Sequence, residues 1–240
     1  MKVFLCIGQS NMAGPCAARW NESDDAGLKG VFLLNGEDKW EKAVNPFNRY
    51  STVKLTEGLS GISPASTFSC EMKKAFPDED IGIISNARGA SKIASWQKGE
   101  WLYNEAVRRV RAGCPDKRID GILWLQGEQD VVEKSDYENY AEKLSALIHD
   151  IREDLGGSDI PFIACEIWEN FDQAKDIYKP GIIEVNRQII ETVKKTENCE
   201  MIFGNGELEH VVGDEVHFDS EGMRELGRRF AKKYLEVLEK

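Results

Sequence analysis

One serine stands directly after the first apolar run of the sequence, in the segment Ile7-Gly8-Gln9-Ser10-Asn11-Met12. A serine hydroxyl is a weak nucleophile until a neighbouring base accepts its proton, and histidine suits this task best near neutral pH. His217 is the candidate base. Asp214 precedes it by three residues, so its carboxylate can fold back and accept the Nδ1 proton, which leaves Nε2 facing a nucleophile. We therefore expect Ser10, His217 and Asp214 to act as nucleophile, base and orienting acid in acyl transfer.

The other two histidines fit this role less well. His149 falls in a long amphipathic segment, where a surface or core-edge position is expected. His210 falls in a polar loop without a partner at a useful spacing, and a structural role is expected. His217 is therefore the only histidine whose surroundings suggest catalysis.

The identity of the acid is less certain than that of the base. Glu215 and Asp219 also lie close to His217, and either could orient its ring in place of Asp214. Taken without Ser10, the segment around His217 would be interpreted as a solvated loop that precedes a helix. The presence of a suitably placed serine favours the catalytic interpretation.

Acyl transfer also needs hydrogen-bond donors aimed at the developing oxyanion, and losing one donor typically costs about 2.7 to 4 kcal/mol. Three candidates follow predicted strands: the backbone N–H groups of Ser10 and Gly89 and the side-chain amide of Gln126. Glycine allows the backbone to approach a substrate closely. Gly89 alone could be an ordinary turn glycine and Gln126 an ordinary cap, but their common position after strands favours an oxyanion site.

The elements that would position these residues alternate along the chain. Short apolar runs predict strands buried on both faces, at Val3–Ile7, Ile81–Ser85, Gly121–Leu125, Phe162–Ile167 and Met201–Phe203. Apolar residues three and four apart predict helices between them, at Ala65–Phe76, Trp101–Ala112, Asp136–Leu155, Gly181–Lys194 and Ser220–Leu238. Ser135 is a candidate N-cap of the third helix, and Gly156 a candidate end. This alternation predicts an α/β fold in which helices cover a parallel sheet, with ligands bound beyond the carboxyl ends of the strands.

The stretch Pro15–Ser63 breaks this rhythm. It is expected to be an insertion over the site, with a small hairpin of Val31–Asn35 against Lys39–Val44 that turns at Gly36. The sequence shows neither an internal repeat nor a Pro-rich linker, so residues 1–240 are expected to form a single domain.

Four sequence blocks together resemble a known family. They are G-Q-S-N-M, R-G-A-S-x-I-x-x-W, W-x-Q-G-E-x-D and D-x-V-H-F, in this order along almost the whole chain. They resemble the SGNH-hydrolase superfamily and, within it, the carbohydrate acetyl esterases related to acetylxylan esterases and sialate O-acetylesterases. The resemblance implies a flavodoxin-like three-layer fold with a five-stranded parallel sheet of order 2-1-3-4-5.

The resemblance also assigns roles to residues. It places the nucleophile on Ser10, the base on His217 and the acid on Asp214. It places the oxyanion donors on Ser10, Gly89 and Gln126, and supporting roles on Gln9 and Glu128. Relatives usually carry a second glycine after the one at Gly89, whereas this chain has Ala90.

Candidate substrate contacts follow from the chemistry of sugars, which are commonly held by aromatic faces and by hydrogen-bonding side chains. Trp96 is the first candidate, although a core position is about equally expected, and Ser91 is another. Arg88 could bind a carboxylate such as that of a sialic acid, but an ion pair within the protein is the more common use of such an arginine. Weaker candidates are Trp20, Trp168 and Asn170.

Composition limits the partners. The formal net charge of −11 disfavours nucleic acid and anionic membranes, since both need clustered Lys and Arg. The six cysteines are scattered without zinc-ligand spacing, so a structural metal is not expected. The expected acyl-transfer chemistry requires neither a cofactor nor a metal. Val3–Ile7 is too short for the core of a signal peptide, and we expect a cytoplasmic protein. The oligomeric state stays open.

These observations lead to one principal hypothesis, a carbohydrate O-acetylesterase of the acetylxylan esterase type that acts on a small acetylated sugar through an acyl-enzyme. Two alternatives stay open. One is a sialate 9-O-acetylesterase, and the other is a non-catalytic sugar-binding module on the same fold. A flavodoxin-like nucleotide-binding protein is disfavoured because the sequence lacks both common phosphate-binding glycine motifs.

Overall fold

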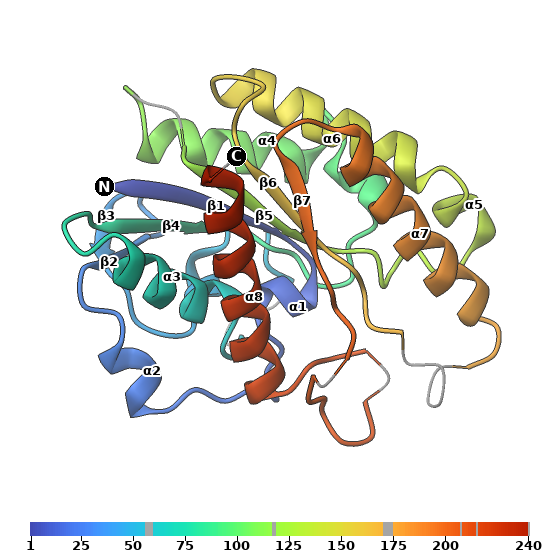
Figure 1. The fold of residues 1–240 in the computed structure, drawn as a ribbon, viewed down its shortest axis with the longest axis horizontal. Coiled ribbons are helices and arrows are strands. Elements are labelled where there is room, and N and C mark those ends of the chain that lie inside the picture. The colour runs from blue at the N-terminus through green and yellow to red at the C-terminus, as the bar shows by residue number, and fades with distance from the viewer. Residues whose placement is uncertain (56–59, 117–118, 170–174, 207, 215, 240) are drawn as a thin grey trace.

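The computed structural model describes residues 1–55, 60–116, 119–169, 175–206, 208–214 and 216–239. Within these residues a seven-stranded sheet has the order β3-β2-β4-β1-β5-β6-β7 (Figure 1). The strands are β1 (Lys2–Gly8), β2 (Val31–Leu34), β3 (Trp40–Lys42), β4 (Ile81–Ser85), β5 (Gly121–Leu125), β6 (Phe162–Cys165) and β7 (Cys199–Ile202). Only the β2–β3 pair is antiparallel among the strand pairs of this described sheet.

Helices cover both faces of the sheet. The α-helices are α1 (Ser10–Ala13), α2 (Glu22–Ala26), α3 (Pro64–Ala75), α4 (Trp101–Gly113), α5 (Lys134–Tyr137), α6 (Tyr140–Leu155), α7 (Lys179–Lys195) and α8 (Ser220–Leu238), and the 3₁₀ turns are η1 (Phe47–Tyr50) and η2 (Ile93–Trp96). In Figure 1, α3 and α8 lie side by side against one face, and α4, α6 and α7 cover the other. The α/β three-layer fold predicted from the sequence is confirmed.

Strand β1 shows how the sequence builds both cores. Its side chains alternate between the faces: Val3, Leu5 and Ile7 pack with α4, α6 and α7, whereas Phe4 and Cys6 pack with α3 and α8. All five are fully buried. Because both faces of this central parallel strand are buried, its residues form the continuous apolar run seen in the sequence.

The predicted order of five strands is present as β4-β1-β5-β6-β7, but the predicted strand count of five is wrong. The hairpin predicted in the insertion forms as β2 and β3, and β2 then pairs in parallel with β4, Val31 opposite Ile81. The physical reason is that Val31 and Leu33 are buried when β2 extends the sheet. The insertion is thus part of the fold.

The long helix predicted at Asp136–Leu155 is also corrected, because the structure divides it into α5 and α6. Asn139 is the N-cap of α6, and Ser135 lies inside α5 and caps neither helix. The end at Gly156 is as predicted, since this glycine has the left-handed conformation (φ 117°) that terminates helices. Across the described part of the chain, no helix is both long and apolar enough to cross a membrane.

The order of the central strands positions the site. β4, β1 and β5 are parallel neighbours, so the segments after Ser85, Gly8 and Leu125 leave the sheet at the same edge. Here Gly8 has a φ of 141°, and a Cβ on it would lie 2.0 Å from the Leu125 carbonyl oxygen. Only glycine fits this approach, which lets the chain turn from β1 directly into Ser10.

Candidate active site

Ser10 is the first residue of α1, at the carboxyl end of β1. Its Oγ lies 2.9 Å from Nε2 of His217, a residue 207 positions later in the loop before α8. The structure thus brings together the predicted nucleophile and base from opposite ends of the chain. At this distance the serine can transfer its proton to the imidazole.

Asp214 lies behind His217 and fixes its ring. Asp214 Oδ2 is 2.8 Å from His217 Nδ1, and Oδ1 accepts hydrogen bonds from the backbone N–H groups of Val216 (2.8 Å) and His217 (3.0 Å). Partial burial acts to raise the pKa of Asp214, but these hydrogen bonds outweigh it and hold the pKa below its usual value. An ionised Asp214 selects the tautomer with the proton on Nδ1 and Nε2 free to accept.

Asp219, one of the two other acids considered for this role, has a different function in the structure. The Asp219 carboxylate is the N-cap of α8 and accepts hydrogen bonds from the backbone N–H groups of Glu221 and Gly222, both at 2.9 Å. Glu215 lies outside the described residues. Of the acids that the structure describes near His217, Asp214 contacts the ring.

Asn11 was not recognised from the sequence as a site residue, although it follows Ser10 in the first block. Its buried Nδ2 donates to Glu128 Oε1 (2.7 Å) and to the Val216 carbonyl (3.0 Å), and its Oδ1 accepts from the Phe218 N–H (3.4 Å). Asn11 therefore connects α1 to the residues on both sides of His217. The position of Asn11 directly after the predicted nucleophile, in the G-Q-S-N-M block, was the signal in the sequence that could have suggested this role.

Two of the three predicted oxyanion donors lie together. The Ser10 N–H is in the first turn of α1, where backbone donors have no partner within the helix. A Cβ built on Gly89 would lie 3.8 Å from Ser10 Cβ, so the Gly89 backbone closely approaches the nucleophile. The following Ala90 adopts φ 53°, the left-handed conformation that favours glycine, and the turn forms despite its side chain.

Gln126 is not brought to this position, which corrects the prediction that its amide is an oxyanion donor. The side chain is fully buried, and Nε2 donates to the Ser91 carbonyl (2.8 Å) and to Asp130 Oδ2 (2.5 Å). An amide group carries two hydrogens, and both are directed into the protein. Gln126 instead joins the turns after β4 and β5.

Gln9 and Glu128, predicted to support the site, lie next to it. Gln9 is buried, and its Oε1 accepts from the Gln129 N–H at 3.3 Å and lies 3.3 Å from Gln126 Nε2, which places the end of β1 against the turn after β5. Glu128 accepts the Asn11 bond through Oε1. Its Oε2 is buried without a hydrogen-bond partner among the described residues, and burial raises the pKa of this carboxyl.

The prediction that Trp96 and Ser91 contact the substrate is wrong, whereas the contact predicted for Arg88 stays a prediction. Trp96 is fully buried on η2, where Nε1 donates to Ser91 Oγ (3.0 Å) and the ring meets Trp124 edge to face at 5.5 Å, so both Trp96 and Ser91 belong to the core. Arg88 donates to the Val53 carbonyl (2.8 Å) and lies over the Trp101 ring. Trp20 packs against the core beside α3 and α8, and Asn170 lies outside the described residues.

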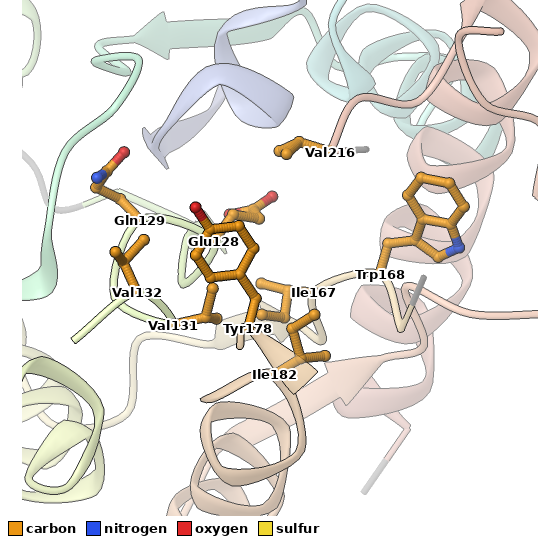
Figure 2. Close-up of a pocket in the computed structure, with 9 residues that line it drawn as sticks. All are labelled: Glu128, Gln129, Val131, Val132, Ile167, Trp168, Tyr178, Ile182 and Val216. Atoms are coloured by element: carbon orange, nitrogen blue, oxygen red, sulfur yellow. The ribbon is translucent and has the colours of Figure 1, made fainter. Parts of the chain in front are cut away.

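Two pockets open at the site. The first, here called the Ser10 pocket, has a volume of about 170 Å³ and is lined by Ser10 and Gly89 together with small or apolar side chains such as Ala13, Ala87 and Leu55. The second, here called the Trp168 pocket, has a volume of about 310 Å³. Figure 2 shows its Tyr178 and Trp168 rings on either side of Ile167 and Ile182, with Val216 opposite. Trp168 was only a weak sequence candidate.

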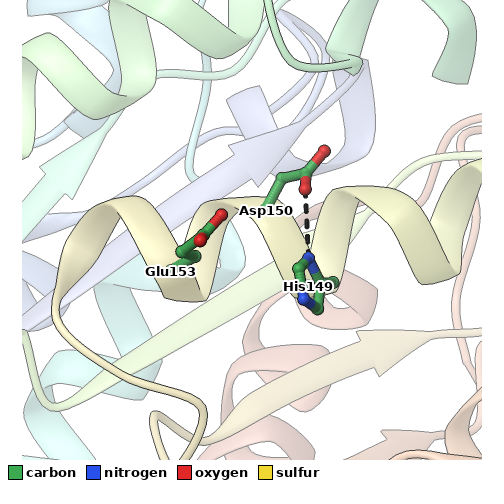
Figure 3. A group of neighbouring side chains, drawn as sticks. All are labelled: His149, Asp150 and Glu153. Carbon is green, nitrogen blue, oxygen red and sulfur yellow. Dashed lines mark hydrogen bonds and ion pairs between the residues drawn. The ribbon is translucent and has the colours of Figure 1, made fainter.

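One group of side chains with metal-ligand chemistry lies elsewhere. His149, Asp150 and Glu153 are neighbours on α6 (Figure 3), with His149 Nδ1 3.1 Å from Asp150 Oδ1. His149 and Glu153 are exposed, and these residues line neither of the two pockets at the site. This arrangement agrees with the surface position expected for His149.

Comparisons with known proteins give the family. Residues 1–236 match a family model described as carbohydrate esterase, sialic acid-specific acetylesterase (SASA). A probable carbohydrate esterase of Arabidopsis thaliana is 27% identical over 251 residues, which cover 98% of this chain and 90% of that protein. Its crystal structure matches with a TM-score of 0.84 at 25% identity, covering 98% of each chain.

Two further structures share the fold at lower identity. NanS matches with a TM-score of 0.78 at 16% identity, covering 99% of this chain and 97% of its own. A carbohydrate acetylesterase from Xanthomonas citri matches with a TM-score of 0.71 at 17% identity, covering 98% of this chain and 56% of its own. The family match over almost the whole sequence shows that this chain belongs to the SASA carbohydrate esterases, in the SGNH acetylesterase branch, and is a serine-type carboxylic ester hydrolase.

Proposed function

We propose that this protein removes O-acetyl groups from sugar hydroxyls through an acyl-enzyme formed on Ser10. The observation that carries the proposal is the chain of two hydrogen bonds from Ser10 Oγ to His217 Nε2 (2.9 Å) and from His217 Nδ1 to Asp214 Oδ2 (2.8 Å). Family membership supports a carbohydrate ester as the substrate.

In the first step, Ser10 Oγ attacks the acetyl carbonyl carbon while its proton moves to His217 Nε2. The negative charge that develops on the carbonyl oxygen is stabilised by the backbone N–H groups of Ser10 and Gly89. Asp214 stabilises the imidazolium that forms. His217 then gives the proton to the sugar oxygen as the carbon–oxygen bond breaks, which releases the sugar and leaves acetyl-Ser10.

In the second step, water replaces the sugar and His217 accepts one of its protons. The resulting hydroxide attacks the acetyl-Ser10 carbonyl, the same two N–H groups hold the oxyanion, and the proton returns to Ser10 Oγ as acetate leaves. Every proton is thus moved by groups that the chain supplies. The small volume of the Ser10 pocket suits an acetyl group better than a long acyl chain.

For the sugar, an acetylxylan-type neutral substrate is the first choice and a sialate 9-O-acetyl ester the second. The family description, which names a sialic acid-specific acetylesterase, supports the second choice. Arg88, the residue considered for a sialate carboxylate, is engaged with Val53 and Trp101. A non-catalytic sugar-binding module is the third candidate, and it predicts binding without release of acetate.

The test is acetate release from p-nitrophenyl acetate and from an acetylated xylo-oligosaccharide by wild type and Ser10→Ala. The variant is expected to lose activity by at least about 10³-fold with an unchanged melting curve. Ser145→Ala, an exposed serine on α6, is the matched control and should retain full activity. Substantial turnover by Ser10→Ala would exclude Ser10 as the nucleophile.

A further inference from the structure

The Trp168 pocket lies beside the base. Val216, which lines it, directly precedes His217, and Glu128, which also lines it, is bonded to Asn11. The Ser10 pocket has a separate lining, which includes Ser10 and Gly89. The site therefore has one pocket on the nucleophile and oxyanion side and another on the side of the histidine loop.

The chemistry of ester cleavage divides these two sides between the two parts of the substrate. The leaving oxygen must receive its proton from His217 Nε2, so the alcohol part of the ester lies against the histidine loop. The acyl carbon is bonded to Ser10 and its oxygen points to the Ser10 and Gly89 N–H groups, so the acetyl group lies on the Ser10 side. The Trp168 pocket is thus the place for the alcohol.

The size and walls of this pocket suit a single sugar ring. Its volume of about 310 Å³ is near the lower limit for small-molecule sites. The Trp168 and Tyr178 rings line this pocket (Figure 2), and aromatic rings commonly hold the apolar side of a sugar ring. The His210 ring stacks on Trp168 and supports it, with 3.3 Å between the ring centroids and an interplanar angle of 17°.

The polar groups of the pocket indicate the charge of that sugar. Among its described lining residues, the ionisable groups are the Glu128 carboxyl and the Tyr178 phenol, and there is neither Lys nor Arg. An uncharged sugar can lie against these walls, whereas a sugar carboxylate would meet the Glu128 carboxyl and no lysine or arginine among the described lining residues. The cation Lys54 lines the Ser10 pocket, where its Nζ donates to the Arg49 carbonyl (2.7 Å).

We infer that the Trp168 pocket binds one uncharged sugar ring as the leaving group and selects neutral acetylated sugars over acetylated sialic acids. This inference rests on the proposed function, since it names the substrate of the same Ser10 site. The inferred preference for neutral sugars differs from the sialic acid specificity named in the family description.

The first experiment compares Trp168→Ala with Trp101→Ala, a matched change of a tryptophan that is 54% exposed and lines neither pocket at the site. The substrates are an acetylated methyl xyloside, which fills the pocket, and methyl acetate, whose alcohol does not reach it. Trp168→Ala should lower kcat/KM about tenfold or more on the xyloside and much less on methyl acetate. Equal losses on both substrates would overturn the inference.

The second experiment adds a cation. Val132 is 37% exposed at the pocket wall, so Val132→Lys should raise kcat/KM on 9-O-acetyl sialic acid about tenfold relative to the xyloside. Val44→Lys, on a 43% exposed residue outside both pockets, is the control and should leave the ratio unchanged. Two results together would overturn the inference: wild type prefers the acetylated sialic acid, and Lys54→Met abolishes this preference. They would place the sugar in the Ser10 pocket. If wild type hydrolyses neither methyl acetate nor any other ester, the proposed function fails instead.

Discussion

The side-chain amide of Asn11 donates to Glu128 Oε1 at 2.7 Å, so the residue after the nucleophile is anchored to the turn after β5. The same amide group donates to the Val216 carbonyl, next to His217. One buried asparagine thus joins three segments of the site: the helix of the nucleophile, a strand-end turn and the histidine loop.

This arrangement predicts that Asn11→Ala lowers kcat about 10- to 100-fold with little change in KM, because displacement of a catalytic group by about 1 Å can cost 10²-fold. The measurement is steady-state kinetics on p-nitrophenyl acetate. Asn104→Ala, an exposed asparagine on α4, is the matched control. A loss confined to KM would mean that Asn11 contributes to binding and does not position His217.

The place of Asp214 behind His217 predicts that Asp214→Asn lowers kcat by up to about 10⁴-fold, because the amide favours the wrong histidine tautomer. KM should change little, and the variant should remain folded. Asp219→Asn tests the alternative acid. Since Asp219 caps α8, that variant should lose at most about 1 kcal/mol of stability and keep its kcat. If Asp219→Asn lost kcat and Asp214→Asn kept it, Asp219 would be the residue that orients His217.

The approach of Gly89 to Ser10 predicts that Gly89→Ala folds normally but loses activity about 10-fold or more. The added Cβ would lie 3.4 Å from Leu55 Cδ1 and 3.8 Å from Ser10 Cβ, which is ordinary contact and no clash. The methyl group would nevertheless occupy space beside the proposed oxyanion. Ala90→Gly is the control next in sequence, and relief of its left-handed backbone should leave activity unchanged and stability within about 1 kcal/mol. An unimpaired Gly89→Ala enzyme would count against the proposed oxyanion site.

The sequence predicted well what depends on local pattern and strand order. Apolar runs identified the five central strands, and the polar segments after them identified Ser10, Gly89 and the histidine loop, because parallel neighbours end at one edge. The hairpin at the sheet edge was recognised, but its pairing with β4 depends on a contact between distant segments and was not.

The direction of individual side chains was the part that could not be predicted. Trp96 and Trp168 both follow strands, yet Trp96 is enclosed against Trp124 while Trp168 lines a pocket and stacks on His210. The Gln126 amide could donate to a substrate or to the protein. It donates to the protein because Asp130, four residues later, supplies a buried acceptor. Such outcomes depend on three-dimensional packing, which leaves no periodic signal in the sequence.

Asp130 gives a prediction about stability and pH. This carboxyl is buried, accepts the Ile93 N–H and the Gln126 amide, and has its pKa raised by burial to about 6. Because the folded-state pKa lies above the unfolded value near 3.9, the folded protein binds this proton more tightly. The stabilisation from Asp130 is therefore fully present below about pH 4 and is lost as the pH rises through 6, by about 3 kcal/mol in total.

Urea unfolding of wild type and Asp130→Asn between pH 4 and pH 7 measures this contribution as the difference between the two free energies of unfolding, which cancels the titration of all other groups. That difference should shift in favour of the variant as the pH rises, whereas parallel curves would mean that Asp130 has the same pKa in both states and that Gln126 is held by an ordinary carboxylate.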